Sequence, residues 1–247
     1  MDNLEANVTE AATTTVSRPG PQRVNGQKAG LRIVTRFCPE DVADPFDTVE
    51  WDSRTATIKG EGGEVLFEQN DCEIPKAWSQ LATNVVANKY LYGEVGTRER
   101  ETGVRQLIHR VCRTIADWGQ DDGYFGDTVQ TEHFYRELVW LCVHQHAAFN
   151  SPVWFNVGLF HQYGVKGAMC NWCWNAEKGD VVQPENPYEY PQGSACFIQS
   201  VGDNMEEIME LARSEAMLFK FGSGTGTDLS SLRSQREKLS GGGRPSG

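Results

Sequence analysis

The sequence predicts an α/β fold, with a small β lead-in, then a mostly helical region, then the first part of a barrel or open sheet. The apolar residues change from a spacing of two to a helical spacing at about Pro75. Much later, residues 194–201 alternate as a strand does, and a helical pattern follows them at once. We therefore expect a disordered tail over residues 1–30, the β lead-in and helices over residues 31–149, and the strand–helix unit over residues 150–247.

The composition is ordinary for a globular protein apart from an excess of acidic residues. Hydrophobic residues make up 39% and charged residues 23% of the 247, and the formal net charge is -11. That charge opposes binding to a nucleic-acid backbone, because nothing neutralises the phosphates. The chain has no apolar run long enough to span a membrane and no basic leader followed by an apolar core. These features predict a cytoplasmic protein with no membrane partner and no nucleic-acid partner.

The lead-in is predicted to be short and rich in β-structure. Residues 1–30 contain Pro19 and Pro21 and show no apolar period, which favours disorder. Residues 31–37 suit a short strand. A small antiparallel meander is expected next, with β-prone segments at residues 48–51, 56–59 and 65–68 and a glycine-rich turn at residues 60–63.

Four helices are predicted beyond the lead-in. The first opens at Pro75, a residue favoured in a first helical turn. Its apolar stripe consists of Trp78, Leu81 and Val85. The second has a clear helical period at Val104, Leu107, Ile108, Val111, Ile115 and Trp118. The third runs over about residues 131–149 and is apolar along most of its length, which indicates burial on more than one side. The fourth begins after Asp203, which resembles a capping box with Glu206.

Two loops have features that suit an anionic ligand. Residues 150–158 end the predicted third helix, because Ser151 precedes Pro152, and the hydroxyl and backbone amides of such a turn can hold a phosphate. Residues 222–226 read Gly-Ser-Gly-Thr-Gly, and glycines let a ligand approach the backbone closely. No Gly-Lys-Ser/Thr follows them, so they are not a P-loop, and they follow a helix, so they are not a dinucleotide fingerprint.

Cys196 lies on the predicted strand of residues 194–201. One face of this strand carries Ser194, Cys196, Ile198 and Ser200, and the other carries Ala195, Phe197, Gln199 and Val201. A lone cysteine on a strand is usually a small buried hydrophobe. A thiol that shares its face with hydroxyls, on a strand that precedes a helix, also suits a polar barrel mouth. The residues alone leave both interpretations open.

The other cysteines and histidines form no complete metal set. Cys170 and Cys173 make a Cys-x-x-Cys pair, which suits half a zinc site, a redox dithiol or two loop thiols. No second pair and no thioredoxin-like context accompany them, so loop thiols are favoured. His144 and His146 are two apart on the predicted third helix, so their side chains are expected on different faces. We therefore predict no metal site.

Three segments in order resemble the start of the class II ribonucleotide reductases. They are Asn-Ser-Pro-Val-Trp-Phe-Asn-Val-Gly at residues 150–158, Gly-Ser-Ala-Cys-Phe-Ile at residues 193–198 with Asp203 following, and the glycine-rich stretch of residues 221–233 that runs into residues 241–247. The resemblance spans residues 37–247. It implies a mostly helical region followed by a ten-stranded α/β barrel, of which this chain holds the first part. It also implies reduction of the ribose 2′-hydroxyl by radical chemistry, in which a cysteine pair supplies the electrons and adenosylcobalamin generates a cysteine radical.

The resemblance assigns roles to individual residues. Cys196 matches the first-strand member of the reducing cysteine pair, which becomes half of a disulfide as the hydroxyl leaves. The positions that match the substrate site are Ser151, Ser194, Ala195 and Gly224. The positions that match the effector site are Asp203, Asn204 and Arg233, and Arg233 opens the loop that senses the effector. The implied partners are a ribonucleoside diphosphate, a deoxynucleotide effector, the remainder of the reductase chain, a thioredoxin-type reductant and a second copy in a homodimer.

The chain departs from the family pattern in ways that bear on activity. It contains no Asn-x-Cys-x-Glu motif for the radical cysteine, and His161 lacks the Asp that would complete an Asp-x-His-x-x-Gly cobalamin motif. The partner of Cys196 is expected beyond residue 247, as is most of the surface that binds adenosylcobalamin. We therefore expect this chain alone to be inactive. Two alternatives stay open: a non-catalytic nucleotide-sensing fragment or subunit of a split reductase, and a dithiol or zinc protein built on Cys170 and Cys173.

Overall fold

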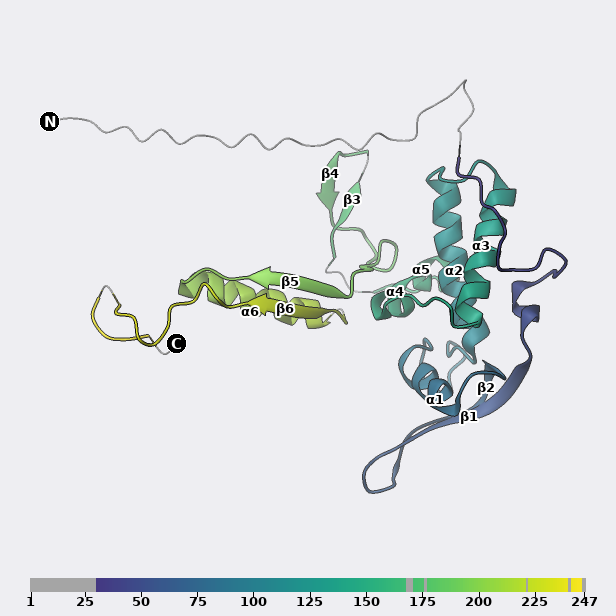
Figure 1. The fold of residues 1–247 in the computed structure, drawn as a ribbon, viewed down its shortest axis with the longest axis horizontal. Coiled ribbons are helices and arrows are strands. Elements are labelled where there is room, and N and C mark those ends of the chain that lie inside the picture. The colour runs from purple at the N-terminus through teal and green to yellow at the C-terminus, as the bar shows by residue number, and fades with distance from the viewer. Residues whose placement is uncertain (1–29, 168–170, 176, 221, 240, 246–247) are drawn as a thin grey trace.

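The computed structural model describes residues 30–167, 171–175, 177–220, 222–239 and 241–245 (Figure 1). Two helices, α2 (Val104–Asp121) and α3 (Thr128–Val143), pack side by side in the helical region. A β-hairpin and α1 lie at one end of this pair, and a β–α–β unit projects away from it. The disordered tail predicted for residues 1–30 lies, except for its last residue, outside the described residues.

The lead-in is one antiparallel hairpin of β1 (Trp51–Lys59) and β2 (Val65–Pro75). The predicted meander is therefore wrong, because the segment at residues 48–51 makes no separate strand: Thr48 ends a 3-10 turn that begins at Pro45, and Trp51 begins the same strand that contains residues 56–59. No turn residue interrupts β1. The Arg54 side chain in the middle of this strand connects it to the residues after β2, because its guanidinium donates to backbone oxygens of Lys76 and Trp78 at 2.8 and 2.6 Å. The turn predicted at residues 60–63 is confirmed, with Gly63 at φ 85°.

The first helix, α1 (Gln80–Lys89), begins later than predicted. Pro75 ends β2 instead, and the hydroxyl of Ser79 caps the helix by accepting from the amide of Ala82 at 3.1 Å. The register of the helix is set by this cap, so Leu81 and Val85 are 74% and 42% exposed. The predicted stripe on Trp78, Leu81 and Val85 is therefore wrong. The face that α1 buries contains Thr83 and Ala87.

The core lies between the hairpin, α2 and α3. Helix α2 confirms the predicted second helix, and buries Val104, Leu107, Ile108, Val111 and Cys112. Helix α3 contributes Tyr135, Val139, Cys142 and Val143. It ends at Val143, six residues before the predicted end, and Gln145 then adopts a left-handed conformation with φ 59°. Burial of these side chains is the main stabilising contribution to this half of the molecule.

Residues 31–37 run extended along α3 and make no strand, apart from a bridge between Leu31 and Phe125. The predicted strand is wrong because the backbone amides bond to a side chain. The carboxylate of Glu137 on α3 accepts from the amides of Arg36, Phe37 and Cys38 at 2.9 to 3.0 Å. This carboxylate is almost buried, so it replaces the sheet partner that the segment lacks.

Replacing Glu137 by alanine should therefore detach residues 36–38 from α3. The variant leaves three amides without their acceptor, and we expect a loss of about 2–4 kcal/mol in the free energy of unfolding. Urea unfolding measures this loss, and hydrogen exchange should accelerate at the amides of residues 36–38. As a control, Glu132→Ala changes another carboxylate of α3, which forms a surface ion pair with Arg113 of α2. This variant should lower the free energy of unfolding by less than about 1 kcal/mol. Equal losses in the two variants would contradict this interpretation.

A second pair of short helices follows α3. Helix α4 (Ser151–Asn156) begins where the sequence predicted only a stop, because Asn150 caps it and Pro152 occupies its first turn. The Asn150 carboxamide accepts from the amide of Val153 at 3.3 Å. Helix α5 (Leu159–Tyr163) starts after Gly158, whose φ of 84° allows the sharp turn between the two.

The last part of the chain contains two small sheets. Strands β3 (Cys173–Asn175) and β4 (Asp180–Val182) form an antiparallel hairpin. Strand β5 (Cys196–Ser200) pairs in parallel with β6 (Gly224–Asp228), and helix α6 (Met205–Lys220) connects them. The predicted strand and fourth helix are thus confirmed, whereas β6 replaces the predicted glycine loop. This β–α–β unit is not a closed barrel, so the ten-stranded barrel stays a prediction.

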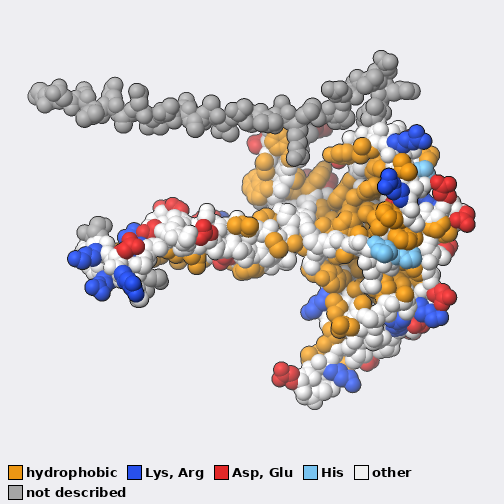
Figure 2. Space-filling view, viewed as in Figure 1, with side chains coloured by type: hydrophobic (Ala, Val, Ile, Leu, Met, Phe, Trp, Pro, Cys, Tyr) orange, Lys and Arg blue, Asp and Glu red, His pale blue; other side chains and the backbone are white. Residues whose placement is uncertain are grey.

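Apolar side chains are spread over the visible face of the helical region (Figure 2). In the described part of the chain, no helix is both long enough and apolar enough to cross a membrane.

Candidate functional site

The parallel pairing of β5 with β6 builds the candidate site. Its register places Cys196 directly opposite Gly224. The amide of Gly224 donates to the carbonyl oxygen of Ala195 at 2.6 Å, and the hydroxyl of Ser223 donates to the carbonyl oxygen of Ser194 at 2.9 Å. The structure therefore brings four predicted site residues together, three from β5 or the residues before it and one from β6.

Gly224 leaves open space beside the Cys196 thiol. A β-carbon added to Gly224 would lie 3.9 Å from the Cys196 sulfur and 3.7 Å from the Ala195 carbonyl oxygen. These are ordinary contact distances, so the fold tolerates a side chain here. The absent side chain instead keeps the space next to the thiol free for another molecule.

The two faces of β5 carry the residues that the sequence predicted for each, and they differ in exposure. Cys196, Ile198 and Ser200 are exposed, while Phe197 and Gln199 on the opposite face are half-buried. Ile198 is 92% exposed, so this face has no cover among the described residues. The Cys196 thiol is free and exposed, so among the described residues it does not pack as a small buried hydrophobe.

The other described cysteines differ from Cys196 in their surroundings. Cys38, Cys72, Cys112 and Cys142 are all buried. Burial raises the pKa of the thiols of Cys38, Cys72 and Cys112, so these thiols stay protonated and unreactive. A hydrogen bond from Cys112 lowers the pKa of Cys142, but both lie inside the core. Cys173 is half-buried at the start of β3, and Cys170 lies outside the described residues.

Ser151 lies on the neighbouring helix α4, which packs against the start of both strands. A β-carbon on Gly193 would lie 3.7 Å from Val153, and one on Gly222 would lie 3.5 Å from Phe155. Ser151 itself shares a hydrogen bond of 3.1 Å with the hydroxyl of Tyr90 on the other side. Helix α4 thus borders the site, although the Ser151 hydroxyl has a partner in the helical region.

The predicted effector residues meet at the far end of β5. The Arg233 guanidinium contacts the Asp203 carboxylate at 2.5 Å and the Asp203 carbonyl oxygen at 3.2 Å. Asp203 does not cap α6 as predicted, because Arg233 occupies its carboxylate. The cap is Asn204, whose side-chain oxygen accepts from the amide of Glu207 at 2.9 Å. The Asn204 and Glu207 pair therefore takes the place of the predicted Asp203 and Glu206 pair, and the Glu207 carboxylate accepts from the Asn204 carboxamide and the amide of Gly202.

The histidines do not assemble a metal site in the described residues, where no group of three or more His, Cys, Asp and Glu is placed to hold an ion. His161 accepts a hydrogen bond from the indole of Trp118 at 3.2 Å. His144 and His146 both contact Trp140, with ring centroids 4.2 and 5.2 Å from the indole. The prediction that they face apart is wrong, because α3 ends before either residue.

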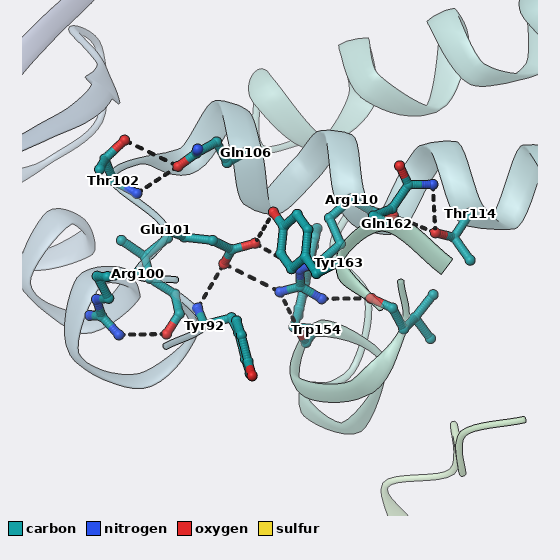
Figure 3. Close-up of polar contacts among 12 residues, drawn as sticks. Tyr92, Arg100, Glu101, Thr102, Gln106, Arg110, Thr114, Trp154, Gln162 and Tyr163 are labelled. Atoms are coloured by element: carbon teal, nitrogen blue, oxygen red, sulfur yellow. Dashed lines mark hydrogen bonds and ion pairs between the residues drawn. The ribbon is translucent and has the colours of Figure 1, made fainter. Parts of the chain in front are cut away.

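Sequence reasoning missed a buried ion pair that supports α4 (Figure 3). The Glu101 carboxylate and the Arg110 guanidinium lie 2.7 Å apart, with side chains 1% and 0% exposed. Arg110 also donates to the carbonyl oxygens of Trp154 and Val157, at 3.0 and 2.6 Å. The hydroxyl of Tyr163 donates to Glu101 at 2.8 Å. The sequence offered one signal of this ion pair: Arg110 is a charged residue that lies between Leu107 and Val111 in the otherwise apolar pattern of α2.

Burial of its hydroxyl and, after that, the charge of Glu101 raise the pKa of Tyr163. The phenol therefore remains a donor at neutral pH, and the Glu101 carboxylate keeps all its partners. The ion pair and its hydrogen bonds connect α2, α4, α5 and the loop before α2 in one network.

Two family descriptions match this chain. Residues 52–145 match "Class II vitamin B12-dependent ribonucleotide reductase", and residues 194–247 match "Ribonucleotide reductase, barrel domain". The first match covers the hairpin, α1, α2 and α3. The second begins two residues before β5 and includes Cys196, Asp203, Gly224 and Arg233.

Curated relatives carry the same family name. The chain is 67% identical over 225 residues to a vitamin B12-dependent ribonucleotide reductase of Rhodopirellula baltica. The aligned region covers 91% of the chain and 22% of the relative. It is 40% identical over 238 residues to the enzyme of that name from Streptomyces coelicolor, and this aligned region covers 95% of the chain and 22% of the relative. The chain thus spans about a fifth of the length of these relatives. The two family matches and these relatives together show that the chain belongs to the class II, vitamin B12-dependent ribonucleotide reductases.

Proposed function

We propose that the chain is the N-terminal part of a ribonucleoside-diphosphate reductase, in which Cys196 supplies one of the two reducing thiols. The pairing of Cys196 with Gly224 carries this proposal, because it sets an exposed thiol beside open space at the start of two parallel strands. Ser194, Ala195 and Gly224 border that space, and Ser151 lies on α4, whose Val153 and Phe155 approach the residues that precede the two strands. Such groups suit the ribose and phosphate of a nucleotide.

The proposed chemistry needs a second thiol. Two thiols lose two electrons and two protons to become a disulfide, and the ribose loses its 2′-hydroxyl as water and gains hydrogen at that carbon. The second cysteine, the radical cysteine and the surface that binds adenosylcobalamin are proposed to belong to the remainder of the reductase chain. The described residues offer no cluster for a metal, and His161 is bonded to Trp118, so we assign no cobalt ligand to this chain.

Assay of the full-length protein tests the proposal. With adenosylcobalamin and a dithiol reductant, it should convert CDP to dCDP, and omission of adenosylcobalamin should stop the reaction. Faster conversion of CTP than of CDP would overturn the diphosphate assignment. Failure to reduce either nucleotide, while nucleotide binding persists, would favour the alternative of a nucleotide-sensing subunit. A thioredoxin-type protein should replace the dithiol, and the cytoplasmic location and homodimer stay predictions.

Asp203, Asn204 and Arg233 are proposed to receive a deoxynucleotide effector. Asp203 and Arg233 are each 34% exposed in their side chains, so their ion pair is accessible to a ligand. In the full-length protein, Asp203→Ala should reduce the effector-dependent change in substrate preference by about fivefold or more, while turnover without effector persists.

The control for this prediction is Glu206→Ala, which removes an exposed carboxylate three residues later, in the first turn of α6. It should leave the effector response unchanged. Steady-state rates for two substrates, with and without effector, measure the response. A full response in the Asp203 variant would show that Asp203 serves only to hold Arg233.

A further inference from the structure

A polar pocket of about 580 Å³ lies between the loop before α2 and the end of α5. Its lining includes Tyr92, Arg98, Glu99, Glu101, Tyr163 and Lys166. It shares no lining residue with the site around Cys196. Gly164, which lines the pocket at the end of α5, has a left-handed backbone with φ 68°.

Two cations of this pocket, Arg98 and Lys166, have no side-chain partner among the described residues. Arg98 and Lys166 are exposed and come from separate loops, and neither forms an ion pair or a side-chain hydrogen bond with another residue in the described part of the chain. A third cation, Arg100, donates to backbone oxygens of Leu91 and Gly93 at 2.7 and 2.8 Å. Arg100 therefore keeps its charge but has its donors occupied.

The carboxylates in the lining do not cancel this charge. Glu101 is already neutralised by Arg110 at the inner wall, where it also accepts from the hydroxyl of Tyr163 and the amide of Tyr92. Glu99 is the remaining carboxylate in the lining. Three cations thus face one uncompensated carboxylate, in a chain that holds 34 acidic and only 23 basic residues.

We propose that this pocket binds the phosphate group of a small molecule, held by Arg98 from one side loop and Lys166 from the other. An ammonium and a guanidinium that line the same pocket without ion-pair partners among the described residues suit a phosphate, which accepts charge-assisted hydrogen bonds from both. The Glu101 carboxylate at the inner wall does not compete with the phosphate for Arg98 and Lys166, since it already bonds to Arg110, Tyr163 and Tyr92. The same chemistry fits a nucleotide or an inorganic phosphate, and the two are separable by experiment.

Hydrogen exchange in the full-length protein tests the pocket, with pyrophosphate and ADP as separate probes. Both probes should slow exchange at residues 92–102 and 163–166. The double variant Arg98→Gln/Lys166→Gln should raise the concentration of probe that gives half of this protection by at least about tenfold, because each lost cation removes a charge-assisted hydrogen bond. Both side chains are exposed, so the variant should fold.

The control is Arg32→Gln/Lys178→Gln, which removes one arginine and one lysine from exposed positions elsewhere and should bind both probes like the wild type. Equal protection by pyrophosphate and ADP identifies the inorganic group as sufficient, and tighter binding of ADP identifies a nucleotide. Either result supports the pocket. The proposal is overturned by absence of protection with both probes, or by equal protection in the Arg98/Lys166 variant. Exchange at residues 194–204 reports separately on the proposed reductase site.

Discussion

Replacing Cys196 by serine in the full-length reductase should abolish repeated formation of deoxynucleotide. Serine keeps the size and polarity of the residue, and the exposed position of Cys196 on β5 tolerates it. A hydroxyl cannot give up electrons to form a disulfide, so reduction of the ribose loses its source of electrons. We expect turnover to fall at least about a thousandfold, the range seen when a residue that performs the chemistry is removed.

Nucleotide binding separates this effect from a folding defect. The variant should bind CDP with unchanged affinity, because the proposed contacts of Ser194, Ala195 and Gly224 with the nucleotide do not involve the thiol. Cys173→Ser provides the matched control, since Cys173 is a free, half-buried thiol on β3. The control should turn over normally. Normal turnover by the Cys196 variant, or loss of activity in the control alone, would show that the reducing thiol has been misassigned.

The sequence predicted the elements whose periodicity is long or whose chemistry is local. Helix α2 was found from six apolar positions, and β5 from its alternation, because burial of one face imposes these periods. The motifs at residues 150–158, 193–198 and 221–233 carried the candidate site. Their grouping around Cys196 and Gly224 required the family resemblance, since residues 28 positions apart in sequence have no local signal of contact.

Two of the errors share a physical cause, which is a bond made by a distant residue. Asp203 does not cap α6 because Arg233, 30 residues later, occupies its carboxylate. Residues 31–37 make no strand because side chains of α3 accept their amides, Gln130 from Ile33 and Glu137 from Arg36 and Phe37. Strand β6 was missed because its glycines suggested a loop, although Thr225 and Thr227 alternate with them and suit a strand. Such long-range partners are not encoded in the local pattern.

The buried pair of Glu101 and Arg110 gives the second large prediction. Arg110→Met leaves the Glu101 carboxylate buried without its counter-ion, and the free energy of unfolding should fall by about 3–5 kcal/mol. The double variant Glu101→Gln/Arg110→Met removes both charges, so it should recover a substantial part of this loss. Urea unfolding of the three proteins, followed by tryptophan fluorescence, measures the difference.

The same substitution should loosen α4, because Arg110 donates to the carbonyl oxygens of Trp154 and Val157 near its end. Hydrogen exchange should therefore accelerate at residues 153–159 in Arg110→Met, and the Ser151 edge of the candidate site should lose its support. The matched control is Arg113→Met, one turn along α2, where the guanidinium forms partly exposed ion pairs with Asp117 and Glu132 and lies over the ring of Tyr135. That variant should cost less than about 1 kcal/mol. If both arginine variants lost the same stability, or the double variant were less stable than Arg110→Met, the network would not be what holds α4 on α2.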